Sequence, residues 1–275
     1  MELTKKRELL SKSSYTVDDL RTIMCLLRSE DGCPWDREQT HKSIRNSFLE
    51  EAYEAVEGID KGDDAILKEE LGDVLLQVVF HARIAEEEGV FDLDDVADGI
   101  CKKLILRHPH VFGNTVCENS DAVLQNWDEI KKVEKHQSSA ADTLRGVSVA
   151  LPSLVRAQKL QKKAAKVGFA FQTDDEALEK LREEFSELCA AHEKKDAENL
   201  SEEIGDLLFA AACFARMNGV DAEEALYRTN EKFLSRFARA EELLEKEECA
   251  ACERDVNKWL AAWKIAKKEP KNSAK

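Results

Sequence analysis

Apolar residues along this chain gather into long stretches that short polar segments separate. One apolar stretch follows Thr16 and continues to Leu27, and another ends at Ile84. Thr16, followed by acidic residues, is typical of a helix N-cap. No part of the chain shows the sustained alternation of apolar and polar residues that a half-buried β-strand requires. The pattern therefore predicts an all-α protein.

Local signals place several further helices. One helix is expected from about Thr40, and another over residues 151–167, where Gly168 ends it. Thr173 and Glu176 have the spacing of a capping box and predict the start of a third helix. Only four prolines and eleven glycines interrupt the chain, which favours long helices.

Four carboxylates in the second half of the chain are spaced as if to converge. Glu184 and Glu187 are three residues apart, as are Glu203 and Asp206, so each pair shares one face of a helix. Both antiparallel pairings, 187 with 203 and 184 with 206, are centred on position 195, inside the polar stretch 192–196. A turn there would bring all four carboxylates to one point.

The same arrangement occurs in the first half of the chain. Its four carboxylates are Glu51, Glu54, Glu70 and Asp73, and both pairings centre on Gly62. Each of these positions lies 133 residues before its counterpart: 51 to 184, 54 to 187, 70 to 203 and 73 to 206. The spacing indicates an internal duplication.

Basic and aromatic residues repeat as well. A Lys-x-x-x-Arg pair and a Trp-x-x-x-Lys pair follow each acidic hairpin; they are Lys103 with Arg107 and Trp127 with Lys131, then Lys232 with Arg236 and Trp263 with Lys267. We therefore predict a tandem repeat of two helical modules, 1–136 and 144–275, joined by a polar linker at 137–143.

Each hairpin needs further packing partners, because two helices cannot bury an apolar face alone. The apolar runs 74–76 and 207–209 are broad enough to pack both within a chain and between chains. We expect four-helix bundles that dimerisation completes, and hence a homodimer.

Charge and hydropathy narrow the class of protein. The net charge of −15 argues against a protein that binds duplex nucleic acid, which needs a basic face. No apolar run approaches the roughly 20 residues of a membrane span, and the basic N-terminus leads into no apolar signal segment. We expect a cytoplasmic protein with no membrane partner.

The converging carboxylates predict a metal site. They would repel one another without a cation, and hard oxygen ligands suit Mg²⁺, with Mn²⁺ as an alternative. A solvated acidic surface would explain a single pair, but the repetition and the helix-disfavouring Gly205 between the ligands favour a site. A di-iron bundle would need Glu-x-x-His from two helices, and only Glu38 and His41 have that spacing.

The repeated basic and aromatic pairs indicate what kind of ligand would bind beside the metal. Lys and Arg one turn apart can hold phosphate groups, Arg through two parallel hydrogen bonds. Trp263 can stack on a base or a sugar, although a tryptophan alone is as often part of a core. Together these residues predict a site for a metal-bound polyphosphate that carries an aromatic base.

The acidic pattern Glu-Glu-x-x-Glu followed by Glu-x-x-Asp resembles that of the all-α nucleoside triphosphate pyrophosphohydrolases. Three stretches resemble the MazG family in particular: GCPWDREQTH at 32–41, RHPHVFG at 107–113 and AAKVGF at 164–169. The resemblance covers nearly the whole chain, including its tandem organisation, and the combination of motifs is highly specific.

The resemblance implies hydrolysis of nucleoside triphosphates, of the ribo or deoxy series, to a monophosphate and pyrophosphate, in housecleaning of the nucleotide pool. It implies that Mg²⁺ is held by Glu184, Glu187, Glu203 and Asp206. It also implies nucleotide contacts from Lys180, Lys232, Arg236, Trp263 and Lys267. Either Glu183 or Glu202, each beside a ligand, would act as the general base, and the sequence does not choose between them.

Two departures and one alternative stay open. Asn199 replaces a lysine of the family pattern, and the run 169–171 reads Phe-Ala-Phe in place of Phe-Asp-Trp. The resemblance implies that the second module is the main catalyst, yet the first module keeps every carboxylate and cation of the set. The alternative function is a nucleotide-sensing module of the same fold that binds without turnover.

Overall fold

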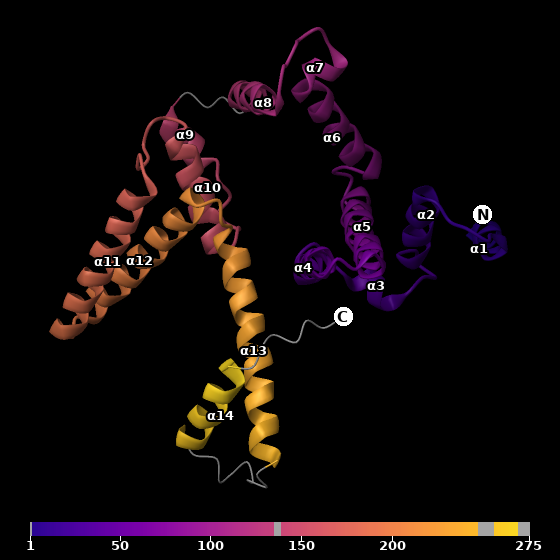
Figure 1. Ribbon diagram of the computed structural model, residues 1–275. Coiled ribbons are helices and arrows are strands. Elements are labelled where there is room, and N and C mark those ends of the chain that lie inside the picture. Colours follow the sequence, from indigo (N-terminus) through magenta and orange to yellow (C-terminus); the bar gives the residue numbers. More distant parts are fainter. Residues whose placement is uncertain (1, 135–138, 247–255, 269–275) are drawn as a thin grey trace. The chain divides into compact units, whose positions relative to one another are not determined.

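A computed structural model of the chain describes residues 2–134, 139–246 and 256–268, and Figure 1 shows how their helices are arranged. Every regular element in these ranges is a helix, which confirms the predicted all-α fold. The chain divides into two compact units, Met1–Lys131 and Lys132–Lys275. Within the described ranges, no helix combines the length and the apolar character that a membrane crossing requires.

The first unit is built on an antiparallel hairpin of α4 (Arg45–Lys61) and α5 (Asp64–Glu87). α2 (Val17–Leu27) packs against α5, and the buried core consists of Met24, Ile44, Val79, Phe80 and Ile84. The other helices of this half are α1 (Glu2–Ser11), α3 (Pro34–Glu38), α6 (Leu93–Arg107), α7 (Pro109–Phe112) and α8 (Ser120–Glu134).

The second unit repeats this plan. α11 (Asp174–Lys194) and α12 (Ala197–Met217) form the hairpin, and α10 (Ser153–Ala165) packs against α12 as α2 packs against α5. α13 (Ala222–Lys246) and α14 (Val256–Lys268) pack together around a second core of Ala240, Leu244, Ala262 and Ala266. The small helix α9 (Ala140–Arg145) precedes α10.

The turns of both hairpins fall where the acidic spacing predicted them. Gly62 ends α4 with φ 63°, and Lys195 ends α11 with φ 56°, so both residues are left-handed. In each turn the next residue, Asp63 or Asp196, donates its N–H back to the preceding helix and caps the following one. The predicted centres of symmetry, 62 and 195, are therefore the left-handed residues themselves.

Two predicted helix starts are confirmed. The hydroxyl of Thr16 accepts a hydrogen bond from the N–H of Asp19 at 3.3 Å, and the Asp19 carboxylate accepts one from the N–H of Thr16 at 2.9 Å. Thr173 caps α11 by accepting from the N–H of Glu176, whose own carboxylate accepts from the N–H of Gln172. Each cap satisfies N–H groups that a helix start otherwise leaves unpaired.

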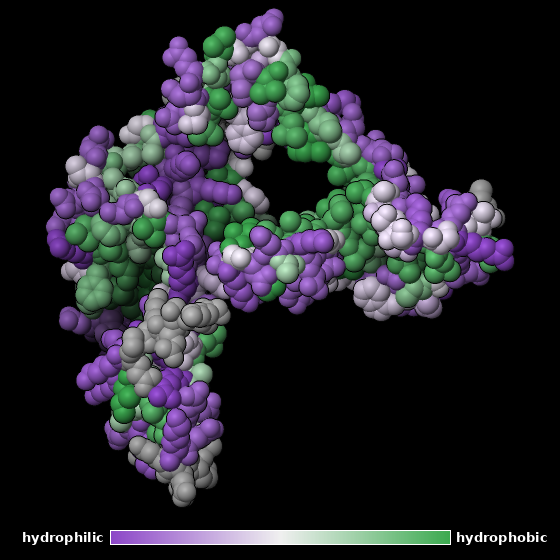
Figure 2. Space-filling model, turned by 45° about the vertical axis from the view of Figure 1, so that its right-hand side comes forward, coloured by the Kyte–Doolittle hydropathy of each residue, from purple (hydrophilic) through white to green (hydrophobic). Residues whose placement is uncertain are grey.

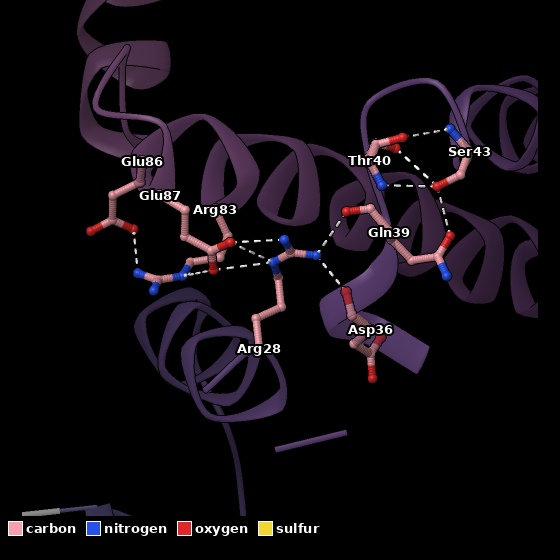
Figure 3. Close-up of polar contacts among 8 residues, drawn as sticks. All are labelled: Arg28, Asp36, Gln39, Thr40, Ser43, Arg83, Glu86 and Glu87. Carbon is pink, nitrogen blue, oxygen red and sulfur yellow. Dashed lines mark hydrogen bonds and ion pairs between the residues drawn. The ribbon is translucent and has the colours of Figure 1, made fainter. Parts of the chain in front are cut away.

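The helix expected from about Thr40 begins later, at Arg45. Thr40 and Ser43 exchange hydrogen bonds between their side chains and backbones: the N–H of Thr40 donates to Ser43 Oγ at 2.9 Å, and the N–H of Ser43 donates to Thr40 Oγ1 at 3.2 Å (Figure 3). Such local bonds compete with a helix. They hold residues 40–43 in a turn before α4.

The structure describes only residues 139–143 of the expected linker, 137–143. Residues 135–138 lie outside the described ranges, so the proposed limits of the two modules stay a prediction. Residues 140–143 form the start of α9, where Ser139 and Asp142 exchange a complete pair of capping bonds. This half of the expected linker is therefore helical.

Candidate metal and nucleotide site

The hairpin of the second unit brings the predicted carboxylates together. Glu184 and Glu187 lie on α11 and Glu203 on α12, and each offers an oxygen within 4.8 Å of the others. Desolvation raises the pKa of Glu203 most, and the negative charges of Glu187, Glu184 and then Asp206 raise it further. Asp206 thus acts electrostatically on the same cluster.

The first unit holds a similar group, made of the counterparts of Glu184, Glu203 and Asp206. Glu51 on α4 and Glu70 and Asp73 on α5 each offer an oxygen within 4.8 Å of the others. The pKa of both glutamates is raised, first by desolvation and then by neighbouring carboxylates, and Glu54 shares a hydrogen bond with each of them. The first unit therefore concentrates negative charge at one point, as the second unit does.

Lys180, expected to contact the nucleotide, lies against the carboxylates of its own helix. Its Nζ is 2.8 Å from Glu184 and 3.0 Å from Glu183. These bonds, to Glu184 first and then Glu183, raise the pKa of Lys180. The Glu184 side chain is buried, with 7% of the residue exposed, so Lys180 supplies the charge that a cation would otherwise supply. Glu202, the other candidate base, is exposed on α12.

The repeated basic and aromatic pairs meet in the first unit, and in the second unit the helices that carry them pack together. In the first, the Arg107 guanidinium lies 5.2 Å from the ring centre of Trp127, and Lys131 Nζ lies 5.5 Å from it. In the second, Phe233, between Lys232 and Arg236 on α13, has its ring 5.2 Å from that of Trp263 on α14. Lys103 and Lys267 are exposed on α6 and α14.

The structure does not join the acidic and the basic sets within one unit. α11 packs on α12, and α13 packs on α14 (Figure 1). Across residues 139–246 and 256–268, no ion pair links Lys232, Arg236 or Lys267 to the acidic cluster. One unit therefore presents two separate halves of the predicted nucleotide site.

A buried arginine positions the loop before α4, and sequence reasoning missed it. Arg28 ends α2, and its guanidinium donates to the carbonyls of Asp36 and Gln39 and pairs with Glu87 on α5 at 2.7 Å (Figure 3). Although burial raises the pKa of Glu87, the hydrogen bonds from Arg28 and Arg83 lower it overall. Nothing in the sequence marks Arg28, because its carboxylate partner lies 59 residues away.

His41, in the same loop, makes a second connection to α5. Its Nδ1 is 2.7 Å from Nδ1 of His81, and the two rings are stacked with centres 5.1 Å apart. Burial, and then the neighbouring His41, lower the pKa of His81. The two connections fix the approach to α4, the helix that carries Glu51 and Glu54.

Comparison with known proteins places this geometry in a family. The family model of the MazG nucleotide pyrophosphohydrolase domain matches residues 39–112 and again 172–239. The two matches begin 133 residues apart, the offset of the predicted duplication.

Curated relatives match over most of the chain. The Thermotoga maritima "Nucleoside triphosphate pyrophosphohydrolase/pyrophosphatase MazG" is 41% identical over 94% of this chain and 98% of its own length. The Escherichia coli K12 "Nucleoside triphosphate pyrophosphohydrolase" is 42% identical over 92% and 97%. The "Uncharacterized protein YabN" of Bacillus subtilis is 43% identical over 92% of this chain and 52% of its own length.

Proposed function

Because the chain belongs to the MazG nucleotide pyrophosphohydrolase family, we propose that it hydrolyses nucleoside triphosphates to a monophosphate and pyrophosphate. The observation that carries this proposal is the carboxylate cluster of the second unit, repeated in the first. A protein that only sensed nucleotides would need neither cluster complete. Housecleaning of the nucleotide pool is the role we propose.

The chemistry of the donor set fits Mg²⁺ or Mn²⁺. All four side chains of each set are carboxylates, the hard oxygen ligands that these ions prefer. Desolvation and then neighbouring negative charges raise the pKa values of Glu51, Glu70 and Glu203, and a divalent cation would offset this surplus of negative charge. We assign the ligands of the main site to Glu184, Glu187, Glu203 and Asp206.

Within this proposal the chain's own residues orient the substrate. A bound Mg²⁺ would neutralise phosphate oxygens and lower the pKa of a water molecule. Lys232 and Arg236 would bind the phosphates, and Trp263 would stack on the base, with Lys267 one turn along. Lys180, once a cation replaces it on Glu184, could turn to the phosphates.

The general base is proposed to be Glu183 or Glu202. Each lies on a ligand helix, at the residue just before a proposed metal ligand, and each is exposed to solvent. Glu183 is paired with Lys180 at 3.0 Å. Replacing each by Gln separates the two, because loss of the base lowers kcat while metal affinity is kept.

A homodimer would join the two half-sites. On the acidic hairpin Phe185, Ile204 and Leu208 are 58%, 46% and 53% exposed, and Phe233 and Phe237 of α13 are 54% and 41% exposed. Figure 2 shows how widely apolar surface reaches the outside of the molecule. Such surface calls for a partner, and a second copy would lay its α13 and α14 near the acidic cluster.

The first unit is proposed as a second, lesser site. It keeps Glu51, Glu54, Glu70 and Asp73, and its Arg107 and Lys131 already lie on Trp127. These are the same types of residue that we propose for the metal and nucleotide site of the second unit.

One assay tests the function. Purified protein is incubated with a panel of nucleoside triphosphates and Mg²⁺, and pyrophosphate and orthophosphate are quantified separately. We expect a nucleoside monophosphate and pyrophosphate in equal amounts, and no reaction in EDTA. Tight nucleotide binding without product would favour the sensing module, and orthophosphate as the product would refute pyrophosphohydrolysis.

A further inference from the structure

A basic cavity lies in the second unit, between α10 and the turn from α12 to α13. Its volume is about 300 Å³, the lower end of the range for ligand pockets. Three of its lining side chains are cations: Lys159 and Lys162 from α10, and Arg216 from the last turn of α12. This concentration of positive charge is unusual in a chain of net charge −15.

The cations of this cavity lack neutralising carboxylates. Across the described part of the second unit, no ion pair involves Lys159, Lys162 or Arg216. Arg216 Nε is buried without a hydrogen-bond partner, and Nη2 has only the weak acceptor Cys213 Sγ, at 3.7 Å. Such a donor is costly to leave unsatisfied. The guanidinium is therefore a ready donor for an anion.

The acid that lines the cavity is already engaged. Asp221 Oδ1 accepts hydrogen bonds from the N–H groups of Glu223 and Glu224, both at 3.0 Å, at the start of α13. The carboxylate therefore compensates the positive end of that helix. One carboxylate faces three cations, so the cavity keeps a surplus of positive charge.

The duplication supplies an internal comparison. In the first unit Arg83, 133 residues before Arg216, donates to Glu87 and Glu86, each at 2.9 Å. Arg83 is followed by Ile-Ala-Glu-Glu-Glu-Gly-Val, whereas Arg216 is followed by Met-Asn-Gly-Val. The second unit therefore lacks the three-glutamate segment that supplies the partners of Arg83. The same arginine is neutralised in one copy and open in the other.

The walls of the cavity are held in place. The side chain of Gln158 donates to the carbonyls of Ala212 and Val220 at 3.1 and 2.9 Å, and accepts from the N–H of Ala222 at 3.2 Å. One glutamine thus ties α10 to the end of α12 and the start of α13. A cavity fixed in this way loses little entropy when an anion binds.

The cavity is separate from the acidic cluster. Arg216 lies 13 residues after Glu203 on the same helix, which corresponds to about 20 Å at 1.5 Å per residue. The Arg216 guanidinium therefore lies far from the phosphates of a nucleotide whose metal is held by Glu203 of the same unit.

We propose that this cavity is a second ligand site, which binds a small phosphate-type oxyanion through Lys159, Lys162 and Arg216. The two lysines supply point charges at the open side, and the guanidinium offers paired N–H donors from the wall. The site needs no metal. The proposal does not rest on the hydrolytic function.

Calorimetric titration with inorganic phosphate and with pyrophosphate tests the site, in EDTA so that the acidic clusters cannot hold an anion through a metal. We expect one anion per chain and binding that weakens with salt. Arg216→Gln, and separately Lys159→Gln with Lys162→Gln, should weaken binding about tenfold or more, as expected when a charged hydrogen bond is lost.

The control is a charge-matched double variant on exposed lysines elsewhere, Lys68→Gln with Lys194→Gln, which should bind as the wild type does. The exposed pair Lys159 and Lys162 keeps the test valid if Arg216→Gln fails to fold. Absence of binding by both anions at millimolar concentration, or equal weakening by the control, would overturn the proposal. Hydrolysis in Mg²⁺ is measured separately, so its failure would leave this result intact.

Discussion

At the scale of single residues, the candidate site concentrates carboxylates that repel one another. In each unit, carboxylates from two helices meet, and desolvation together with mutual repulsion raises the pKa of Glu51, Glu70 and Glu203. Lys180 offsets part of this charge in the second unit. A divalent cation bound to the carboxylates would offset the negative charge of either cluster.

The raised pKa of Glu203 predicts a pH dependence of stability. Its folded-state pKa lies above the ordinary 4.5, so the folded protein binds the proton more tightly than the unfolded chain does. Stability is therefore lost as pH rises from 4.5 through the folded-state pKa. Glu203→Gln removes the titrating carboxyl group, so the stability of this variant lacks this pH dependence.

The measurement is thermal unfolding in EDTA across this pH range. The melting temperature of Glu203→Gln should rise relative to the wild type as pH increases, and Mg²⁺ should narrow the difference by stabilising the wild type. A difference that is constant with pH would contradict the electrostatic account. Glu193→Gln, an exposed glutamate near the end of α11, serves as the control.

At the scale of elements, symmetry in the sequence located the hairpins well. The paired carboxylates centre on Gly62 and Lys195, the left-handed residues of the two turns. The start of α4 was predicted less well, because Thr40 and Ser43 bond each other locally. The role of Arg28 could not be predicted at all, since its partner Glu87 is far away in the sequence.

The two turns differ in a way that stability measurements can detect. Gly62 has φ 63° with open space where a Cβ would lie, so Gly62→Ala should destabilise the fold by about 1 kcal/mol through backbone strain alone. Lys195 already bears such strain at φ 56°, so Lys195→Gly should be neutral or stabilising by up to about 1 kcal/mol.

Denaturant unfolding of both variants gives the answer. We expect the free energy of unfolding to fall in Gly62→Ala and to stay the same or rise in Lys195→Gly. Equal destabilisation by both changes would contradict the strain at Lys195, and the two turns would then not be equivalent.

At the scale of the whole molecule, the sequence predicted the content of the nucleotide site and left its assembly open. Acidic and basic sets lie on different pairs of helices, α11 with α12 and α13 with α14. We propose that they meet through contacts between two copies of the chain. The exposed apolar residues of both pairs indicate where a second copy would bind.

The proposed dimer makes a prediction about Leu208, which is 53% exposed on α12. Leu208→Glu should shift the protein from dimer to monomer in light scattering and lower hydrolysis in parallel, because a charge would be buried at the interface. Leu10→Glu, at a position 84% exposed on α1, is the matched control and should remain dimeric. A monomeric wild type would refute the dimer.

The most direct test of the central proposal is the rate of pyrophosphate release in Mg²⁺ by variants of the acidic cluster. Glu184→Gln and Asp206→Asn should each lower the rate at least about 100-fold, because metal stabilisation of the transition state is worth several kcal/mol. Glu51→Gln, the equivalent change in the first unit, should retain most of the activity. Full activity in both Glu184→Gln and Asp206→Asn would contradict the assignment of the second unit as the main catalytic site.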